Sequence, residues 1–170
     1  TLKQKIWPYW QLPNSNTLKN LNKEDILLDE LEELLQDAVR KQLISDVPVG
    51  VLLSGGVDSS LITAMAARAM KGIKTFTVSF KGFNEFDESK HARLIADEFE
   101  TDHFELVASN PEPEILISLA RQFDEPMIDS SMLPTYLVSK LIKDHCTVAL
   151  GGDGGDELFG GYSTHSRLMW

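Results

Sequence analysis

The residue types that could do chemistry gather in the run SGGVDSS at residues 54–60. Two glycines let a backbone approach a ligand closely, and amide N–H groups at a helix N-terminus point toward bound anions. The run has no lysine, unlike the Walker phosphate loop, and it adds Asp58. A carboxylate repels a polyphosphate unless a divalent cation lies between them, so Asp58 implies Mg²⁺. The run therefore predicts a site for a polyphosphate and Mg²⁺.

An ordinary strand-to-helix turn is the alternative interpretation of this run. In that case Ser54 or Asp58 would cap the helix and no ligand would bind. A cap alone explains neither the paired glycines nor the three clustered serine hydroxyls. We therefore favour the anion site.

A second run, GGDGGDELFGGY at residues 151–162, is also rich in glycine and acidic residues. In an open parallel sheet, ligands bind beyond the carboxyl ends of the strands, and both runs follow predicted strands. Asp58 and Asp156 are therefore expected to face one pocket and to bind the same Mg²⁺. The alternatives are a calcium-binding β-helix repeat, which needs stacked copies where the chain has one, and a flexible acidic turn. Neither alternative accounts for the first run.

The elements that must position the two runs alternate between strands and helices. Apolar, β-branched and aromatic segments predict strands at residues 47–53, 73–80, 103–107 and 146–150. Helices are predicted from about residue 22, over residues 61–70, from 86–89 to about 98, over 111–123 and over 133–143. This alternation predicts βαβ units in a three-layer α/β/α, Rossmann-like domain with a parallel sheet in the order 3-2-1-4.

The N-terminal part of the chain has a different composition. Residues 1–22 hold two prolines and several aromatic residues without periodicity, which predicts a linker from a preceding domain. Residues 23–170 are then expected to be the first portion of one α/β domain that continues beyond them. The first helix of that domain has an apolar stripe formed by Leu27, Leu31, Leu34, Leu35 and Ala38, which we expect to face the core.

Composition narrows the function classes. A chain of 170 residues with 42% hydrophobic residues can bury one core of ordinary size. Its net charge of −10 argues against a nucleic-acid partner, whose affinity depends on basic contacts to phosphates. A single cysteine, Cys146, excludes an internal disulfide and is expected to be a core thiol, while His103 is expected to be a hydrogen-bonded structural residue. Without a membrane-spanning apolar run or a secretory segment, we predict a cytoplasmic protein with no membrane partner.

Several longer motifs, taken in order, resemble the synthetase domain of glutamine-dependent asparagine synthetases, in the PP-loop ATP pyrophosphatase superfamily. The resemblance runs from about Trp10 to the end of the chain. It includes ISDVPVG at 44–50, the first glycine-rich run, EFDES at 85–89, TDH at 101–103, FDEP at 123–126, LPTYL at 133–137 and the second glycine-rich run. Long motifs in a shared order are specific evidence.

The resemblance implies a ligase. ATP would activate the side-chain carboxylate of aspartate as an acyl-adenylate, and ammonia from a glutaminase domain of the same full-length chain would give asparagine and AMP. The resemblance places pyrophosphate at Ser54, Gly55, Gly56, Asp58, Ser59 and Ser60, adenine at Leu52, Val78 and Gly152, and Mg²⁺ at Asp58 and Asp156. It also allows a homodimer of the full-length enzyme.

Two departures from the family pattern concern the acceptor. Asp153 stands where asparagine-forming members carry a catalytic glutamate, so a catalytic role is expected for the shorter carboxylate. Ser130 and Ser131 fall in the acceptor-recognition segment but lack an arginine that some members have there. The acceptor is therefore aspartate or another carboxylate, such as a sugar uronate.

Two further function classes compete with the ligase. tRNA-modifying enzymes of the same superfamily should show basic faces or cysteine pairs, and this sequence has neither. A nucleotide-binding regulatory module is the non-enzymatic alternative, although two acidic loops suit a polyphosphate that is cleaved. The resemblance places a nucleophilic cysteine in the family's glutaminase domain and a catalytic lysine after the second glycine-rich run. Neither is among these 170 residues, so we expect the chain alone to bind nucleotide without catalysis.

Overall fold

The structure is a computed structural model that describes residues 3–11, 24–80, 88–108, 112–123, 125, 129 and 131–168. It divides into two units, Thr1–Leu34 and Leu35–Trp170. In the first unit, residues 3–11 are exposed, and the Lys5 Nζ lies 6.0 Å from the ring centroid of Trp7. The expected linker boundary at residue 22 stays a prediction, because residues 12–23 lie outside the described residues.

Helix α1 (Glu24–Gln42) crosses the boundary between the two units. Acidic residues occupy its first turn and basic residues its last turn, as the helix dipole favours. The second unit continues with β1 (Val49–Leu52), α2 (Val57–Ala69), β2 (Lys74–Phe80), α3 (Ser89–Glu98), β3 (Asp102–Ala108), α4 (Glu114–Gln122), α5 (Met132–Ile142), β4 (Val148–Leu150), α6 (Gly155–Phe159) and α7 (Ser163–Leu168).

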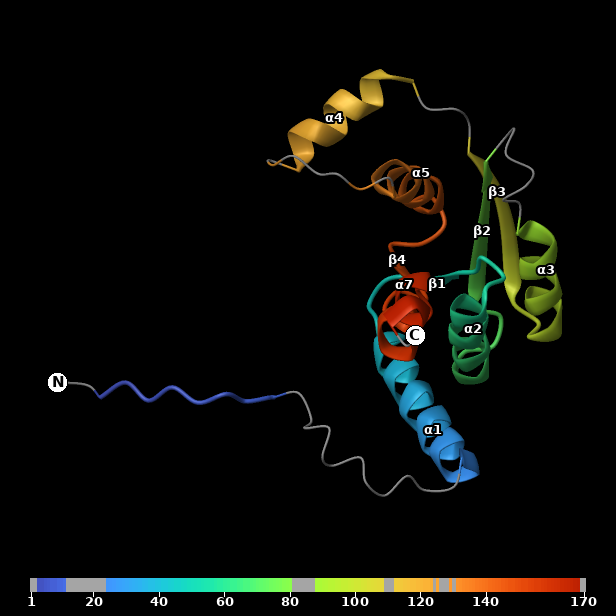
Figure 1. Cartoon of the computed structure of the whole chain (residues 1–170). Helices are drawn as coiled ribbons and strands as arrows, with labels where there is room; N and C mark the ends of the chain where they lie inside the picture. Colours follow the sequence, from blue (N-terminus) through green and yellow to red (C-terminus); the bar gives the residue numbers. More distant parts are fainter. Residues whose placement is uncertain are drawn as a thin grey trace. The chain divides into compact units, whose positions relative to one another are not determined.

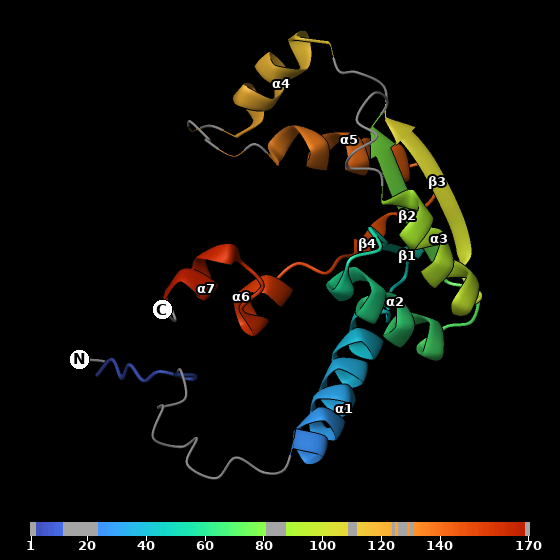
Figure 2. The same ribbon diagram turned by 45° about the vertical axis from the view of Figure 1, so that its right-hand side comes forward.

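The four strands form one parallel sheet in the order β3-β2-β1-β4. The register pairs Val51 of β1 with Thr75 of β2 on one side and with Leu150 of β4 on the other. Helices α2 and α3 cover one face of the sheet, and α5 covers the opposite face (Figures 1 and 2). The predicted three-layer fold and its strand order are confirmed. Both glycine-rich runs therefore leave carboxyl ends of neighbouring strands.

Successive side chains of a strand point to opposite faces of the sheet, so the buried residues form a core on each face. Val51 and Leu53 are almost completely buried on the side of α2 and α3, in clusters with residues of those helices. Leu52 and Phe76 face the other side, where Phe76 packs with Ile142 and Cys146 near α5. A Cβ on Gly50 would overlap the Phe76 ring, so this glycine makes room for the aromatic side chain. The prediction that Cys146 is a core thiol is confirmed.

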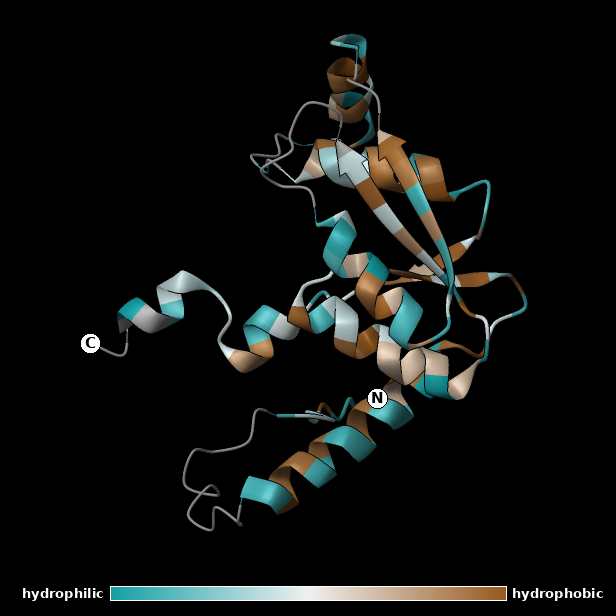
Figure 3. Ribbon diagram, turned by 90° about the vertical axis from the view of Figure 1, so that its right-hand side faces the viewer, coloured by the Kyte–Doolittle hydropathy of each residue, from teal (hydrophilic) through white to brown (hydrophobic). Residues whose placement is uncertain are grey.

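The part of α1 in the second unit corrects the expected apolar stripe. Val39 is the buried residue of the helix and Leu43, directly after its end, is also buried, whereas Ala38 is exposed. The last turns of α1 pack on α2: Val39 lies in a cluster with Met65, and the Gln36 side chain donates a hydrogen bond of 3.0 Å to the Met65 carbonyl. Hydrophobic segments of the ribbon occur in both the strands and the helices, while the ribbon next to the C-terminus is mostly white and teal (Figure 3). Among the described residues, no helix is long and apolar enough to span a membrane.

Candidate functional site

The first glycine-rich run forms a tight loop between β1 and α2. Gly55 has a φ of +86°, a conformation that glycine adopts readily, and a Cβ there would lie 2.8 Å from the backbone nitrogen of Ala92 in α3. Gly56 occupies the N-cap of α2 with a φ of −71°, and no side chain caps the helix. The alternative in which Ser54 or Asp58 caps the helix is therefore wrong.

Two serine hydroxyls hold this loop in shape. The Ser59 Oγ accepts a hydrogen bond from the Ser54 backbone N–H at 3.2 Å and donates to the Gly56 carbonyl at 3.2 Å. The two hydroxyls lie 2.9 Å apart, and Ser54 Oγ also accepts from the Gly56 N–H at 3.3 Å. Because Ser59 gives its proton to Gly56, Ser54 is the donor between the hydroxyls. Both side chains close the loop on itself.

The second glycine-rich run packs directly on the first. A Cβ on Gly152 would lie 2.9 Å from the Asp58 Cβ and 3.0 Å from the Ser59 backbone nitrogen. A Cβ on Gly155 would lie 2.5 Å from a carboxylate oxygen of Asp58. Since real Cβ atoms do not make such contacts, these glycines let the loop after β4 approach the start of α2. The two glycine-rich runs therefore pack against each other in direct contact.

A cavity of about 350 Å³ opens where the two runs meet. It is lined by Leu52, Ser54, Gly56, Asp58, Ser59, Gly151, Gly152, Asp153, Gly154, Asp156, Glu157 and Tyr162. Four of these residues are carboxylates, and no lysine or arginine stands among the described residues of the lining. A polyphosphate can bind in such an acidic cavity only together with a cation that neutralises part of the negative charge.

The donor set of the cavity fits Mg²⁺. Asp58 and Asp156 are both half-buried and line the same cavity, and carboxylate oxygens are the ligands that this hard cation prefers. Within the described part of the chain, no group of three or more His, Cys, Asp or Glu forms a complete metal cage. Mg²⁺ is commonly held by one or two carboxylates together with substrate phosphates and water, so a pair of aspartates agrees with its chemistry.

A second, more apolar cavity of about 170 Å³ lies on the α5 face of the sheet. Its lining comprises Leu52, Leu53, Ser54, Phe76, Thr77, Val78, Glu88 and Val138. Leu52 and Ser54 line both cavities, so the acidic and the apolar space adjoin at the end of β1. A flat apolar ligand group could lie between Val78 of the sheet and Val138 of α5, next to a charged group in the first cavity.

The structure brings together most of the site residues predicted from the sequence. The acidic cavity contains Leu52, Ser54, Gly56, Asp58, Ser59, Gly152, Asp153 and Asp156, and the second cavity contains Val78. Gly55, Ser60 and Ser131 are not among the described residues that line either cavity, and Ser130 lies outside the described residues. Instead, the Ser131 backbone N–H donates to Asp129 at 2.8 Å, which lowers the pKa of that carboxyl. The functional roles of all these residues remain predictions.

Sequence reasoning assigned no role to Glu157 and Tyr162, which line the acidic cavity. The Tyr162 hydroxyl donates a hydrogen bond of 2.6 Å to the Glu157 carboxylate. This bond lowers the pKa of Glu157 and raises the pKa of the Tyr162 phenol. The Tyr162 ring also contacts His165, with centroids 5.7 Å apart. The motif ELFGGY contained both residues, but it carried no signal that the chain folds back to join them.

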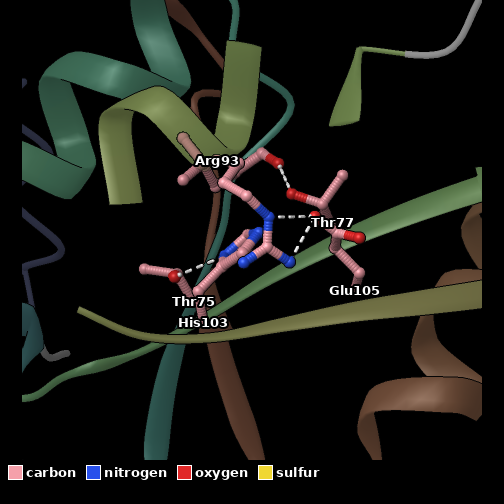
Figure 4. A network of polar contacts seen from close by, with 6 residues as sticks. Thr75, Thr77, Arg93, His103 and Glu105 are labelled. Carbon is pink, nitrogen blue, oxygen red and sulfur yellow. Dashed lines mark hydrogen bonds and ion pairs between the residues drawn. The ribbon is translucent and has the colours of Figure 1, made fainter. Parts of the chain in front are cut away.

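A separate polar network lies between α3 and the start of β2 and β3 (Figure 4). The His103 Nδ1 is 2.9 Å from the Thr75 hydroxyl, as expected for a structural histidine, while its Nε2 is buried without a partner in the described part of the chain. Burial lowers the pKa of His103. Arg93 of α3 donates to Glu105 of β3 at 2.7 Å and ties the helix to the sheet. Thr75 and His103 lie one residue after the starts of β2 and β3, and neither lines the two cavities.

Comparisons with known proteins identify the family of this chain. The family model described as asparagine synthase matches residues 30–170, which include both glycine-rich runs. The chain belongs to the asparagine synthase family. A sequence from Methanocaldococcus jannaschii is 39% identical over 160 residues, which cover 92% of this chain and 30% of that relative. The glutamine-hydrolysing asparagine synthetase 1 of Bacillus subtilis is 41% identical over 150 residues, covering 86% of this chain and 23% of the relative.

The chain thus spans less than a third of the length of these curated relatives. Among solved structures, an ammonia-dependent NAD synthetase from Campylobacter jejuni is similar with a TM-score of 0.48 and 18% identity. That similarity covers 79% of this chain and 60% of the other. Both glycine-rich loops lie within the part of this chain that matches the asparagine synthase family.

Proposed function

We propose that this chain is the nucleotide-binding portion of an ATP-dependent amidoligase that adenylates the side-chain carboxylate of aspartate. The observation that carries the proposal is the pair of adjoining cavities, which share Leu52 and Ser54. One is acidic and bounded by glycine-rich loops, and the other is mostly apolar. A nucleoside triphosphate has the same division, with a charged polyphosphate joined to a flat base.

The proposed binding mode follows from this division. The base lies in the apolar cavity between Val78 and Val138, and the phosphates lie against the start of α2, where backbone N–H groups favour anions. Asp58 and Asp156, which line the acidic cavity, would hold Mg²⁺. When bound, Mg²⁺ neutralises the charge that develops on the departing pyrophosphate.

The reaction needs activation because a carboxylate is a poor electrophile. An oxygen of the acceptor carboxylate attacks the α-phosphorus, the bond from the α-phosphorus to its bridging oxygen breaks, and pyrophosphate leaves with the bonding electrons. Ammonia then attacks the acyl carbon, AMP leaves, and a proton must be removed from the new amide nitrogen. We assign that proton to Asp153, an exposed carboxylate of the cavity wall.

The ammonia source belongs to the proposal as well. Relatives are named for glutamine hydrolysis, and we propose that a glutaminase domain of the same full-length protein supplies ammonia to this site. Another carboxylate acceptor, such as a sugar uronate, is the second candidate, because Asp153 stands where asparagine-forming relatives of the family have glutamate. A homodimer of the full-length enzyme is the assembly we propose.

An ATP–pyrophosphate exchange assay on the full-length protein tests the function. Radiolabelled pyrophosphate should enter ATP only when Mg²⁺ and an acceptor carboxylate are present, and aspartate should be the best acceptor of a panel that includes uronates. Exchange with a uronate but not with aspartate would transfer the proposal to the second candidate. Tight ATP binding without exchange for any acceptor would reject the ligase and favour the nucleotide-binding module.

A further inference from the structure

Glu157 differs from Asp58 and Asp156, two other carboxylates of the acidic cavity, in how it is held. Asp58 and Asp156 lie against Gly155 and Gly161, where the two glycine-rich runs and the following turn close tightly. Glu157 instead projects from α6 and accepts the 2.6 Å hydrogen bond from Tyr162, and both residues line the cavity. A carboxylate fixed by a phenol has a defined orientation at low entropic cost.

The chain is shaped to make this contact. Gly160 has a φ of +72°, and the Gly161 N–H donates to the Asp156 carbonyl at 3.0 Å. A Cβ on Gly161 would overlap the Asp156 carboxylate, so a glycine is required for the reversal that follows α6. The reversal brings Tyr162 back over α6, and His165 supports its ring from α7.

The proposed substrate needs a group of this kind. An amino-acid acceptor carries an ammonium group, which loses its hydration when it enters a site and then requires an acceptor of hydrogen bonds. Asp58 and Asp156 are already assigned to Mg²⁺ and Asp153 to the proton transfer. The Tyr162 phenol donates its only proton to Glu157, so its remaining lone pairs can also accept a hydrogen bond from an ammonium.

We propose that Glu157, positioned by Tyr162, binds the ammonium group of an amino-acid acceptor and so selects amino acids over carboxylates that lack an amine. This inference rests on the proposed function and names the group that determines its acceptor specificity. Glu157 contacts the substrate in this assignment, whereas Tyr162 acts through Glu157 as a positioning residue.

The test compares aspartate with succinate, which has the same carbon chain without the amine. Pyrophosphate exchange is measured on the full-length protein and on the variants Glu157→Gln and Tyr162→Phe. Glu98→Gln, at the exposed end of α3, is the matched control for the charge change, and Tyr9→Phe is the control for the lost hydroxyl. Circular dichroism and thermal unfolding confirm that each variant is folded.

Glu157→Gln should lower the preference for aspartate over succinate by about 10- to 100-fold, the effect expected for losing a charge-assisted hydrogen bond. The change should lie in the KM for aspartate, while the KM for ATP and the Mg²⁺ requirement stay within about threefold of wild type. Tyr162→Phe should move the preference in the same direction by roughly 3- to 10-fold, since the carboxylate is retained but less fixed. Both control variants should match wild type.

Three results would overturn the assignment. An unchanged preference in Glu157→Gln would show that the residue does not contact the ammonium. A raised Mg²⁺ requirement with an unchanged preference would assign Glu157 to the metal instead. If the wild-type protein shows no exchange with aspartate or succinate, the proposed function itself fails and this assignment fails with it.

Discussion

Gly152→Ala is the substitution that tests most directly whether the two glycine-rich loops form one site. The added Cβ would lie 2.9 Å from the Asp58 Cβ, 3.0 Å from the Ser59 backbone nitrogen and 3.1 Å from the Asp58 carbonyl carbon. Carbon atoms in good contact are about 3.5–4.0 Å apart, so the loops must separate by roughly 1 Å. Because the opposing atoms belong to the first turn of α2, no flexible side chain can absorb the strain.

The expected cost has two parts. Overpacking of this size destabilises a protein by about 1–3 kcal/mol, which for 170 residues lowers the melting temperature by roughly 2–12 °C. A displacement of about 1 Å at a site that depends on orientation can cost on the order of 100-fold in activity. We therefore expect Gly152→Ala to be folded, less stable, and strongly impaired in Mg²⁺-dependent binding of pyrophosphate.

Thermal unfolding and titration calorimetry with pyrophosphate, with and without Mg²⁺, measure both parts. Gly56→Ala is the matched control for stability, because its Cβ would lie 3.4 Å from the Ser54 Oγ and its φ of −71° suits any residue. Because alanine is a poorer N-cap than glycine, the control should lose some stability, but less than Gly152→Ala, which adds the overlap with α2. If Gly152→Ala kept both the wild-type melting temperature and the wild-type affinity, the close approach of the two loops would be refuted.

Three further predictions follow from the site and its surroundings. Asp58→Asn should abolish most pyrophosphate exchange in the full-length protein with little loss of stability, and near-normal exchange at ordinary Mg²⁺ would reject the metal assignment. The isolated chain should bind ATP or pyrophosphate weakly and only with Mg²⁺, and should form no asparagine from ammonia; measurable asparagine would show a complete catalytic set within it. Because burial lowers the pKa of His103 below its ordinary 6.5, the unfolded state gains protons first, so unfolding free energy should fall as pH drops below about 6.5. In urea titrations His103→Gln should show a shallower fall, and an unchanged slope would contradict this account.

The sheet could be predicted from the sequence because its signals are local. Each strand is a short run of β-branched or aromatic residues, and each glycine-rich run follows such a strand. Since carboxyl ends of parallel strands lie at one edge of a sheet, the sequence also indicated that Asp58 and Asp156 would come together. The cavity that both residues line bears out this juxtaposition, although their binding roles remain predictions.

The features that escaped prediction depend on packing between distant segments. Val138 forms a wall of the apolar cavity only because α5 covers the sheet opposite α2, which no local pattern reveals. The pairing of Tyr162 with Glu157 depends on the positive φ of Gly160. In α1, the apolar residues recur so densely that periodicity permits several faces, and the tertiary structure selects Val39 in the helix and Leu43 directly after it.

The Ser54 and Ser59 hydroxyls form hydrogen bonds within their own loop, so they fix its shape before any ligand binds. The resemblance assigned Ser54 and Ser59 to pyrophosphate, yet in the structure their protons go to Ser59 and to the Gly56 carbonyl. Unless one of these two hydroxyls rotates, neither Ser54 nor Ser59 has a hydroxyl proton left for a phosphate, and backbone N–H groups at the start of α2 remain as donors. A loop whose side chains fix those N–H groups in advance needs little reorganisation when an anion binds. We therefore expect the hydroxyls in this motif to shape the predicted anion site through the backbone, and direct contact with a ligand to be a second and separable role.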